Sequence, residues 1–232
     1  MERVPCPMLY EIYEKRQVFD PAGGVHKLDQ AANIRFCEAL YNLVVKIKPT
    51  TVVEVGMANG CTSTAILAGL DANKQGKLIS IDPGQTSQWK NCGRETVRRA
   101  GLESRHEFIE DFDYNALPML LARGVKPELG YIDGWHTFDY CLLDWFYIEK
   151  MMAVGGIIGF NDSHFRAVHK CLKFVQTHRH YEEIDVGLPK VYDSRIPVIG
   201  SIIKRIEGRN ASDRYFKKLD TWEPYTQDYF SF

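Results

Sequence analysis

Short apolar segments alternate with longer segments of helical pattern between residues 51 and 178, and no other feature constrains the fold as strongly. We expect strands at 51–55, 77–82, 105–110, 128–133 and 155–160, and helices at 61–71, 90–101, 113–124, 138–152 and 164–178. The strand segments are continuously apolar, as in strands that crossover helices bury on both faces. The sequence therefore predicts a doubly wound, mostly parallel α/β sheet of the Rossmann-like type.

The segments on either side of this alternation extend the predicted domain. Two late strands, at about 181–186 and 198–206, have no long helix between them and predict a C-terminal antiparallel hairpin, which brings the sheet to seven strands. Residues 1–48 are expected to form a helical or lid-like extension, with a helix over 29–47 that ends before Pro49. We expect the cofactor-binding domain to span 49–206. Residues 207–232 form an aromatic tail that either docks on the domain or forms an interface, such as that of a homodimer.

Composition limits the classes of partner. The 232 residues are 45% hydrophobic, which is enough for one substantial core. The net charge is −1 and no basic block stands out, so we expect no nucleic-acid partner. No apolar run approaches the ~20 residues needed to span a bilayer, and we expect a cytoplasmic protein that does not associate with membranes. The six cysteines form no C-x-x-C pair, which indicates free thiols in a reducing compartment.

The stretch VEVGMANGCTS, residues 53–63, joins the first strand of the alternation to its helix. Its G-x-A-x-G spacing differs from the G-x-G-x-x-G of dinucleotide-binding turns. Small residues at this point let the backbone approach a ligand closely, and the N–H groups that open the next helix face the same side. The candidate ligand-binding residues of this turn are Gly56, Ala58, Gly60, Thr62 and Ser63.

Two acidic residues accompany the turn. Glu54 lies inside the first strand, and Asp82 ends the second strand, 26 positions after Gly56. A carboxylate there can accept hydrogen bonds from ribose hydroxyls and repels a 2′-phosphate, which favours an adenosine-type ligand. The alternative is that the glycines only make a tight turn between strand and helix.

The pattern E-x-G-x-A-x-G, followed by Asp82 at the end of the next strand, resembles class I S-adenosylmethionine (SAM)-dependent methyltransferases. The resemblance implies that the turn surrounds the methionine and ribose portions of SAM. It implies that Glu54 serves the methionine amino end through a local network and that Asp82 holds the ribose. It also implies that Glu110 or Asp111, in the segment FIEDF, lies near the adenine.

A second group of polar residues follows the fourth and fifth strands of the alternation. Asp133 ends one strand, and Asn161 and Asp162 end the other, so their oxygens would gather near the turn and suit Mg²⁺ or another divalent ion. His136 precedes a helix whose dipole disfavours imidazolium, so we expect a neutral histidine that can act as general base. Alternatively, these residues only cap the turn and helix that follow them.

The D-G-x-H sequence, with the later amide and acid pair, is similar to metal-dependent O-methyltransferases that act on natural-product sugars, and to catechol-type enzymes. The resemblance implies that Asp133, Asn161 and Asp162 bind the metal and that His136 is the base. Asp133 would therefore serve catalysis, the metal and the cofactor together. The acceptor would be a small hydroxylated molecule such as a phenol, a sugar or a hydroxy acid. Asn161 departs from the acidic residue that many of these relatives carry.

Other residues could contact the ligands. His26 and Gln30 are candidates for a lid over the cofactor, or for a plain surface turn, and Trp89 and Trp135 for the walls of the cavity. We expect His178 at the surface. Two other functions fit the same fold class: a nicotinamide-dependent oxidoreductase and a non-catalytic partner protein with the SAM-binding fold.

Overall fold

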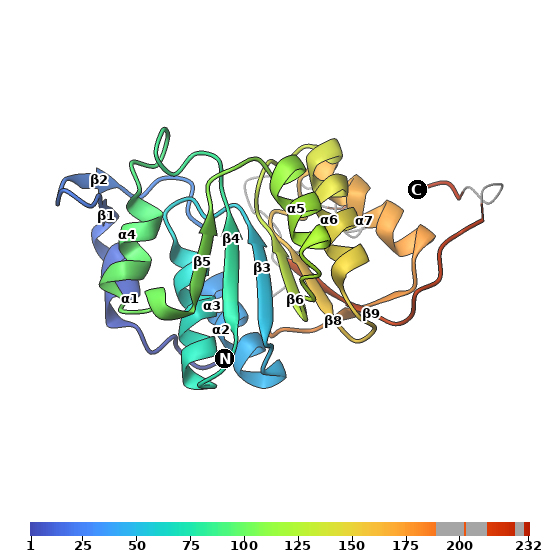
Figure 1. Cartoon of the computed structure of the whole chain (residues 1–232), viewed down its shortest axis with the longest axis horizontal. Coiled ribbons are helices and arrows are strands. Elements are labelled where there is room, and N and C mark those ends of the chain that lie inside the picture. The colour runs from blue at the N-terminus through green and yellow to red at the C-terminus, as the bar shows by residue number, and fades with distance from the viewer. Residues whose placement is uncertain (189–201, 203–212, 226–229) are drawn as a thin grey trace.

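The computed structural model of the chain describes residues 1–188, 202, 213–225 and 230–232. Its main feature is a mixed seven-stranded sheet of order β5-β4-β3-β6-β7-β9-β8 (Figure 1). The strands of this sheet are β3 (Thr51–Val55), β4 (Lys77–Ile81), β5 (His106–Ile109), β6 (Leu129–Ile132), β7 (Ile157–Phe160), β8 (Tyr181–Ile184) and β9 (Arg214–Lys218). The predicted fold class is thus confirmed, including the parallel centre and the antiparallel edge.

The chain order of the parallel strands creates a switch point in the sheet. From β3 the chain proceeds outward to β4 and β5, and it then returns so that β6 pairs with the free side of β3. The connections after β3 and β6 therefore leave the sheet side by side and in opposite directions. Ligands of open α/β sheets bind at such a point, beyond the carboxyl ends of the strands.

Helices cover both faces of the sheet. They are α1 (Pro7–Lys15), α2 (Ile34–Ile47), α3 (Cys61–Ala72), α4 (Cys92–Arg99), α5 (Asp113–Ala122), α6 (Phe138–Met151) and α7 (Arg166–His178). One apolar core joins α5, α6 and α7 to side chains such as Val53 and Ile79, and a second joins α2, α3 and α4 to the next residues along, Val52 and Leu78. Successive strand residues point to opposite cores, which explains why the strand segments are apolar throughout.

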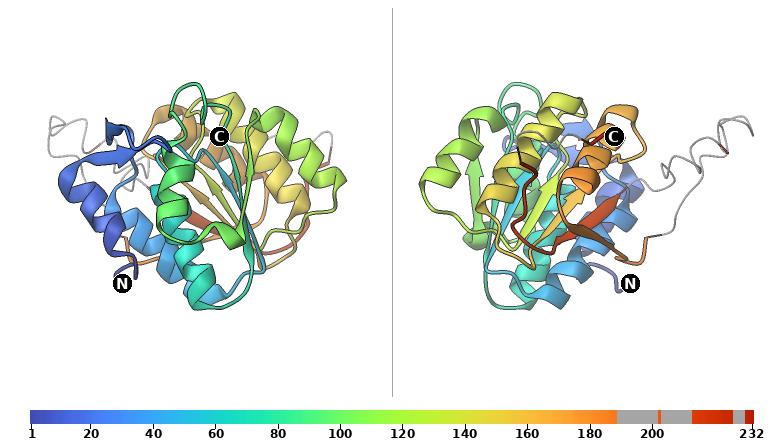
Figure 2. Two further views of the ribbon diagram at one scale, coloured as in Figure 1. Left: turned by 60° about the vertical axis from the view of Figure 1, so that its left-hand side comes forward. Right: turned by 90° about the vertical axis from the view of Figure 1, so that its right-hand side faces the viewer.

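The N-terminal segment contains more regular structure than its turn-rich sequence predicts. Strands β1 (Gln17–Phe19) and β2 (Val25–Lys27) form a separate antiparallel hairpin, which packs with α1 outside the main sheet (Figure 2). The helix expected from residue 29 begins only at Ile34, because the side chain of Asn33 accepts a hydrogen bond from the Arg35 N–H at 2.9 Å and caps it. The residues before Asn33 therefore stay out of the helix.

The antiparallel edge differs from its predicted position along the chain. The strand expected at 198–206 lies outside the described residues, apart from Ile202. The strand that pairs with β8 is β9, which lies in the segment expected as an aromatic tail. Tyr215 and Phe216 are almost fully buried, one in each apolar core. These two aromatic residues serve the interior of the sheet.

A buried lysine fixes the end of β9 to α6. The Nζ atom of Lys218 donates hydrogen bonds to the backbone oxygens of Glu149 and Met152, at 2.9 and 3.0 Å. It also lies 2.9 Å from a carboxylate oxygen of Glu149. Lys218 thus caps the C-terminal carbonyls of α6 while pairing with a buried acid.

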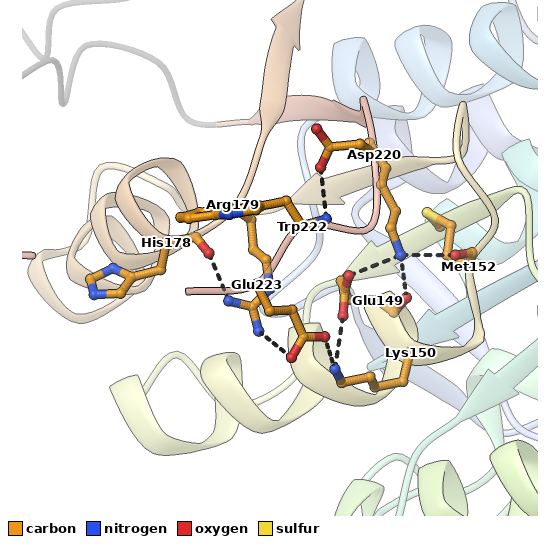
Figure 3. Close-up of polar contacts among 9 residues, drawn as sticks. Glu149, Lys150, Met152, His178, Arg179, Asp220, Trp222 and Glu223 are labelled. Atoms are coloured by element: carbon orange, nitrogen blue, oxygen red, sulfur yellow. Dashed lines mark hydrogen bonds and ion pairs between the residues drawn. The ribbon is translucent and has the colours of Figure 1, made fainter. Parts of the chain in front are cut away.

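The segment after β9 continues across α6 and α7. Figure 3 shows the carboxylate of Glu223 between Lys150 and Arg179, and both cations pair with it. His178, which we expected at the surface, is buried instead, and its ring contacts Phe230 and Phe232 edge to face. The described part of the tail therefore docks on its own domain.

Two further observations concern membrane-spanning helices and the cysteines. None of the helices in the described ranges is long and apolar enough to cross a membrane. All six cysteines belong to those ranges, and each is free and buried.

Candidate active site

A cavity of about 640 Å³ opens at the switch point, beyond the carboxyl ends of the central strands. Its volume lies within the usual range of small-molecule sites. The residues of the glycine turn, its acidic partners and the second polar group that line it are Gly56, Ala58, Asp82, Asp133, His136, Asn161 and Asp162. The fold therefore brings the glycine turn and the second polar group into one cavity.

The glycine turn makes a close approach to the turn that follows β6. Gly56 has a φ of +89°, and a Cβ atom on it would lie 2.1 Å from the backbone oxygen of Asp133. Gly60 has a φ of +75°, and a Cβ atom there would lie 2.5 Å from the backbone oxygen of Gly93. Only glycine fits at either position, because both the dihedral angle and the neighbouring backbone exclude a side chain.

Asp82 holds this turn in place. Its Oδ2 atom accepts hydrogen bonds from the backbone N–H groups of Met57 and Ala58, at 3.1 and 2.7 Å, and its Oδ1 accepts one from Gly84 at 2.7 Å. The side-chain amide of Gln85 donates to Asp82 Oδ2 at 3.2 Å and to the Ala58 oxygen at 2.7 Å. These contacts hold Ala58 at a φ of +45°, which is unusual for a residue with a side chain. Oδ1 is the less occupied oxygen.

Glu54 lies beneath the turn, and it does not line the cavity. Its carboxylate accepts hydrogen bonds from the hydroxyls of Thr62, Ser63 and Ser80, at 2.7, 2.5 and 2.7 Å. Burial raises the pKa of Glu54 to about 7, against the opposing effect of the three donors. Among the cofactor contacts expected from the sequence, Glu54, Gly60, Thr62 and Ser63 thus shape the turn from the side away from the cavity.

The loop after β5 lines the cavity with other residues than the two expected near the adenine. Glu110 accepts hydrogen bonds from the N–H and hydroxyl of Thr86, at 2.6 and 2.8 Å, and neither Glu110 nor Asp111 lines the cavity. The next two residues, Phe112 and Asp113, do line it. The apolar pattern locates the end of β5, but it does not show which side chains of the following loop turn inward.

The N-terminal segment supplies one wall of the cavity. Residues 30–33 and Phe36 line it, and so do Trp89 and Trp135, as expected for the two tryptophans. The amide of Asn59 donates to the backbone oxygen of Asp29 at 2.6 Å, which ties this segment to the glycine turn. His26 lies away from the cavity. Phe165, which also lines the cavity, and Phe36 carried no signal in the sequence beyond being apolar.

The catalytic edge, as we call Asp133, His136, Asn161 and Asp162, closes the other side of the cavity. Nε2 of His136 lies 3.5 Å from a carboxylate oxygen of Asp133 and 3.5 Å from one of Asp162. Asp162 has a φ of +49°, so its backbone is held in an uncommon conformation. The four side chains converge from the ends of β6 and β7, as the sequence predicts.

The pKa of His136 shifts in the opposite direction to the expectation. Burial lowers the pKa of His136, but Asp133 and Asp162 outweigh burial, and the net effect raises the pKa above its ordinary value. The idea that the dipole of α6 keeps this histidine neutral is therefore wrong in direction, because two close carboxylates act more strongly than a partial helix charge. Burial also raises the pKa of Asp133, to about 6, while His136 opposes that shift.

The donor atoms suit a hard cation only in part. Asp133 and Asp162 offer carboxylate oxygens, and the amide nitrogen of Asn161 donates to Asp213, which leaves its carbonyl oxygen as the atom available to a ligand. No group of three histidine, cysteine, aspartate or glutamate side chains in the described ranges has the geometry to hold a metal ion. The donor chemistry of the two carboxylates and the Asn161 carbonyl oxygen fits a hard cation.

Comparison with known proteins gives a consistent picture. Residues 53–163 match the family described as "Methyltransferase domain". A search of curated proteins returned no match.

Solved structures share the fold at low sequence identity. An O-methyltransferase from Bacillus cereus in complex with SAH aligns with a TM-score of 0.68 at 12% identity, covering 92% of this chain and 91% of that one. Cofactor-bound Rv0187 from MTB aligns with a TM-score of 0.67 at 14% identity, covering 93% and 89%. The O-methyltransferase TomG from Streptomyces achromogenes, involved in tomaymycin synthesis and solved with SAM, aligns with a TM-score of 0.64 at 12% identity, covering 83% of each chain. These likenesses show that the chain shares the fold of the solved structures, and the family match places a methyltransferase-domain sequence over the part of the chain that carries the turn at the switch point.

Proposed function

We propose that this protein transfers the methyl group of SAM to a hydroxyl of a small acceptor, such as a phenolic or sugar-containing natural product. The observation that carries the proposal is the position of His136. Its Nε2 atom lies 3.5 Å from two carboxylates, and the residue lines the same cavity as the glycine turn. Structural neighbours described as O-methyltransferases agree with transfer to oxygen.

The residues present fit SAM. The space above Gly56 and Ala58 admits a ligand against bare backbone, since both residues line the cavity. Asp82 keeps Oδ1 with one donor only, so we assign it one hydrogen bond from a ribose hydroxyl, whereas the sequence suggested both hydroxyls. Phe112 and Asp113 are the candidates for the adenine end.

The chemistry required of the protein is positioning and proton removal. SAM, when bound, supplies a methyl group already activated by a sulfonium. The neutral form of His136 accepts the proton of the acceptor hydroxyl on its imidazole ring. Asp133 and Asp162 then stabilise the imidazolium that results, as their effect on the pKa of His136 indicates. Trp135 and Phe165 line the cavity at this side and would cover an apolar face of the acceptor.

A divalent ion such as Mg²⁺ is the second part of the proposal. Asp133, Asn161 and Asp162 would hold it through oxygen atoms, after a small movement of their side chains. Such an ion lowers the pKa of a bound hydroxyl and so assists the base. Proton removal by His136 alone remains the version without metal.

The test begins with ligand binding. Calorimetry should detect SAH at micromolar concentrations, with no comparable binding of NAD. The protein should then convert SAM to SAH in the presence of a phenol or a sugar, with product mass higher by one methyl group. Failure to bind SAM or SAH at millimolar ligand would end the proposal.

The cellular compartment and the oligomeric state of the protein are also proposals. The six free, buried cysteines suit a reducing compartment such as the cytoplasm. A homodimer is the oligomer we would look for, and sedimentation of the purified protein would decide it.

A further inference from the structure

Asp213 lies directly opposite Asn161 at the edge of the sheet that bears the active site. Strands β7 and β9 are antiparallel, and their last pair on this side is Phe160 with Arg214. Asn161 follows the first of these residues and Asp213 precedes the second, so the two side chains meet just beyond the pair. Both residues are almost completely buried.

A closed set of hydrogen bonds connects the two residues to a tyrosine. Nδ2 of Asn161 donates to Oδ1 of Asp213 at 2.9 Å and to the hydroxyl of Tyr131 at 3.3 Å. The Tyr131 hydroxyl donates in turn to Oδ2 of Asp213 at 2.9 Å. Tyr215 donates to the same oxygen at a longer 3.4 Å. Both hydrogens of the Asn161 amide are thus used inside the protein.

This set of bonds decides which end of the Asn161 amide faces the cavity. The two ends of an amide have nearly the same shape, so its orientation is chosen by its partners. A reversed amide would put its oxygen against the Asp213 carboxylate and lose both inward bonds, an arrangement that buried groups do not tolerate well. The carbonyl oxygen of Asn161 therefore faces outward, and this side chain adds to the effect of the two carboxylates on His136.

We propose that Asp213 is a positioning residue of the active site, which fixes Asn161 with its carbonyl oxygen facing the acceptor and His136. Asp213 acts only through Asn161 and touches no reactant. With Asp213 in place, the catalytic edge presents acceptor atoms that can bind a hydroxyl proton, an imidazolium or a cation. Without it, the edge could present an N–H donor that binds none of these. The assignment rests on the proposed function for its catalytic consequence, whereas the orientation of the amide can be tested without it.

The test uses one conservative change, one exchange and one control in the full-length protein. Asp213→Asn keeps the shape and removes the carboxylate. The double variant Asn161→Asp/Asp213→Asn keeps one amide and one carboxylate in the pair but exchanges their strands. Tyr215→Phe removes the longer contact to the same carboxylate and leaves Asn161 untouched. We expect Tyr215→Phe to retain wild-type behaviour in every measurement below.

The first measurement is hydrogen exchange of the Asn161 side-chain amide, followed by ¹⁵N NMR in the SAH-bound protein and assigned through Asn161→Asp. We expect Asp213→Asn to accelerate this exchange at least about tenfold while the backbone amides of β3 and β6 change little. Unchanged exchange, or equal acceleration of the backbone amides, would show that Asp213 has no positioning role or only a structural one. This result is independent of methyl transfer.

The second measurement is kcat and KM for methylation of catechol. We expect Asp213→Asn to lower kcat at least about tenfold with the KM for SAM nearly unchanged, and the exchanged pair to recover most of that loss. An exchanged pair that folds as well as the wild type but is no faster than Asp213→Asn would overturn the catalytic consequence. A wild-type protein that methylates no acceptor would instead count against the proposed function, with the exchange data still deciding the position of Asn161.

Discussion

The imidazole of His136 lies 3.5 Å from the carboxylate of Asp133, and the two residues are separated by a single turn of backbone after β6. A second carboxylate, that of Asp162, lies at the same distance and follows the neighbouring parallel strand β7. The histidine is thus held between two acids that reach it from neighbouring strands. Because of this geometry, the protonation state of His136 is the property of the site that a pH titration tests most directly.

Methyl transfer should rise with pH along an acid limb whose midpoint lies above 6.5. The pKa of His136 is raised from that value, and only its neutral form can accept a proton, so the active fraction grows as pH increases through the raised pKa. Asp162→Asn removes one of the raising charges and should move the limb to lower pH. His136→Gln should reduce kcat by about 10²- to 10⁴-fold with SAH affinity retained. If the acid limb of Asp162→Asn had the same midpoint as that of the wild type, the limb could not be assigned to His136.

Gly56→Ala should abolish SAH binding and destabilise the protein. The new methyl group would lie 2.1 Å from a backbone oxygen in a residue with φ of +89°. We expect a loss of more than about 3 kcal/mol in unfolding free energy, since strain in the left-handed region adds to steric overlap. Gly124→Ala is the control, because Gly124 has a φ of +71° with open space around it. It should cost about 1 kcal/mol and leave SAH binding intact, and equal losses in denaturant titrations would refute the role of close approach.

Lys218→Met should lower the free energy of unfolding by about 3 to 5 kcal/mol, because it removes the closer of the two cations beside the buried carboxylate of Glu149 and leaves the end of α6 without its cap. Lys217→Met, on the exposed face of the same strand, should change stability by less than about 0.5 kcal/mol. Replacing both partners, in Lys218→Met/Glu149→Leu, should recover a large part of the loss. Urea denaturation of the four proteins checks these values, and a double variant as unstable as Lys218→Met would count against the buried pair.

Removal of divalent ions with a chelator should distinguish metal-assisted methyl transfer from transfer that depends on His136 alone. If Asp133, Asn161 and Asp162 bind a divalent ion during catalysis, EDTA should lower the rate at least about tenfold and Mg²⁺ or Mn²⁺ should restore it. SAH affinity should not change, because the cofactor contacts of Asp82 and the glycine turn do not involve the ion. A full rate in chelator would leave proton removal by His136 as the whole mechanism.

Much of the fold could be predicted from local patterns. Strands buried on both faces are apolar throughout, and glycine at a switch point is required by backbone contact, so 51–55 and Gly56 were recognisable. Strand β9 was not, because it carries Lys217 and Lys218 in a segment otherwise rich in polar and aromatic residues. Lys218 is buried only because its partners lie about 70 positions away in α6, and no window of sequence contains them.

For the candidate site, the sequence could predict which residues lie together, but not their pKa values or hydrogen-bond partners. Residues at strand ends converge by topology alone, which explains why the sequence could place Asp133, His136 and Asp162 together. The pKa of His136 depends on two carboxylates at 3.5 Å, and only coordinates supply those distances. Asp82 illustrates the same limit, since most of its hydrogen-bonding capacity serves the turn itself.

The insertion of β9 between β7 and β8 has a consequence for the order in which the protein matures. During synthesis, the glycine turn, Asp82 and His136 all leave the ribosome well before Asp213 and its strand. Residues that line the cavity are therefore synthesised before Asp213, the buried partner of Asn161 on the strand β9 side. Along the chain, the residues proposed to bind the methyl donor thus come before the residue proposed to complete the edge that uses it.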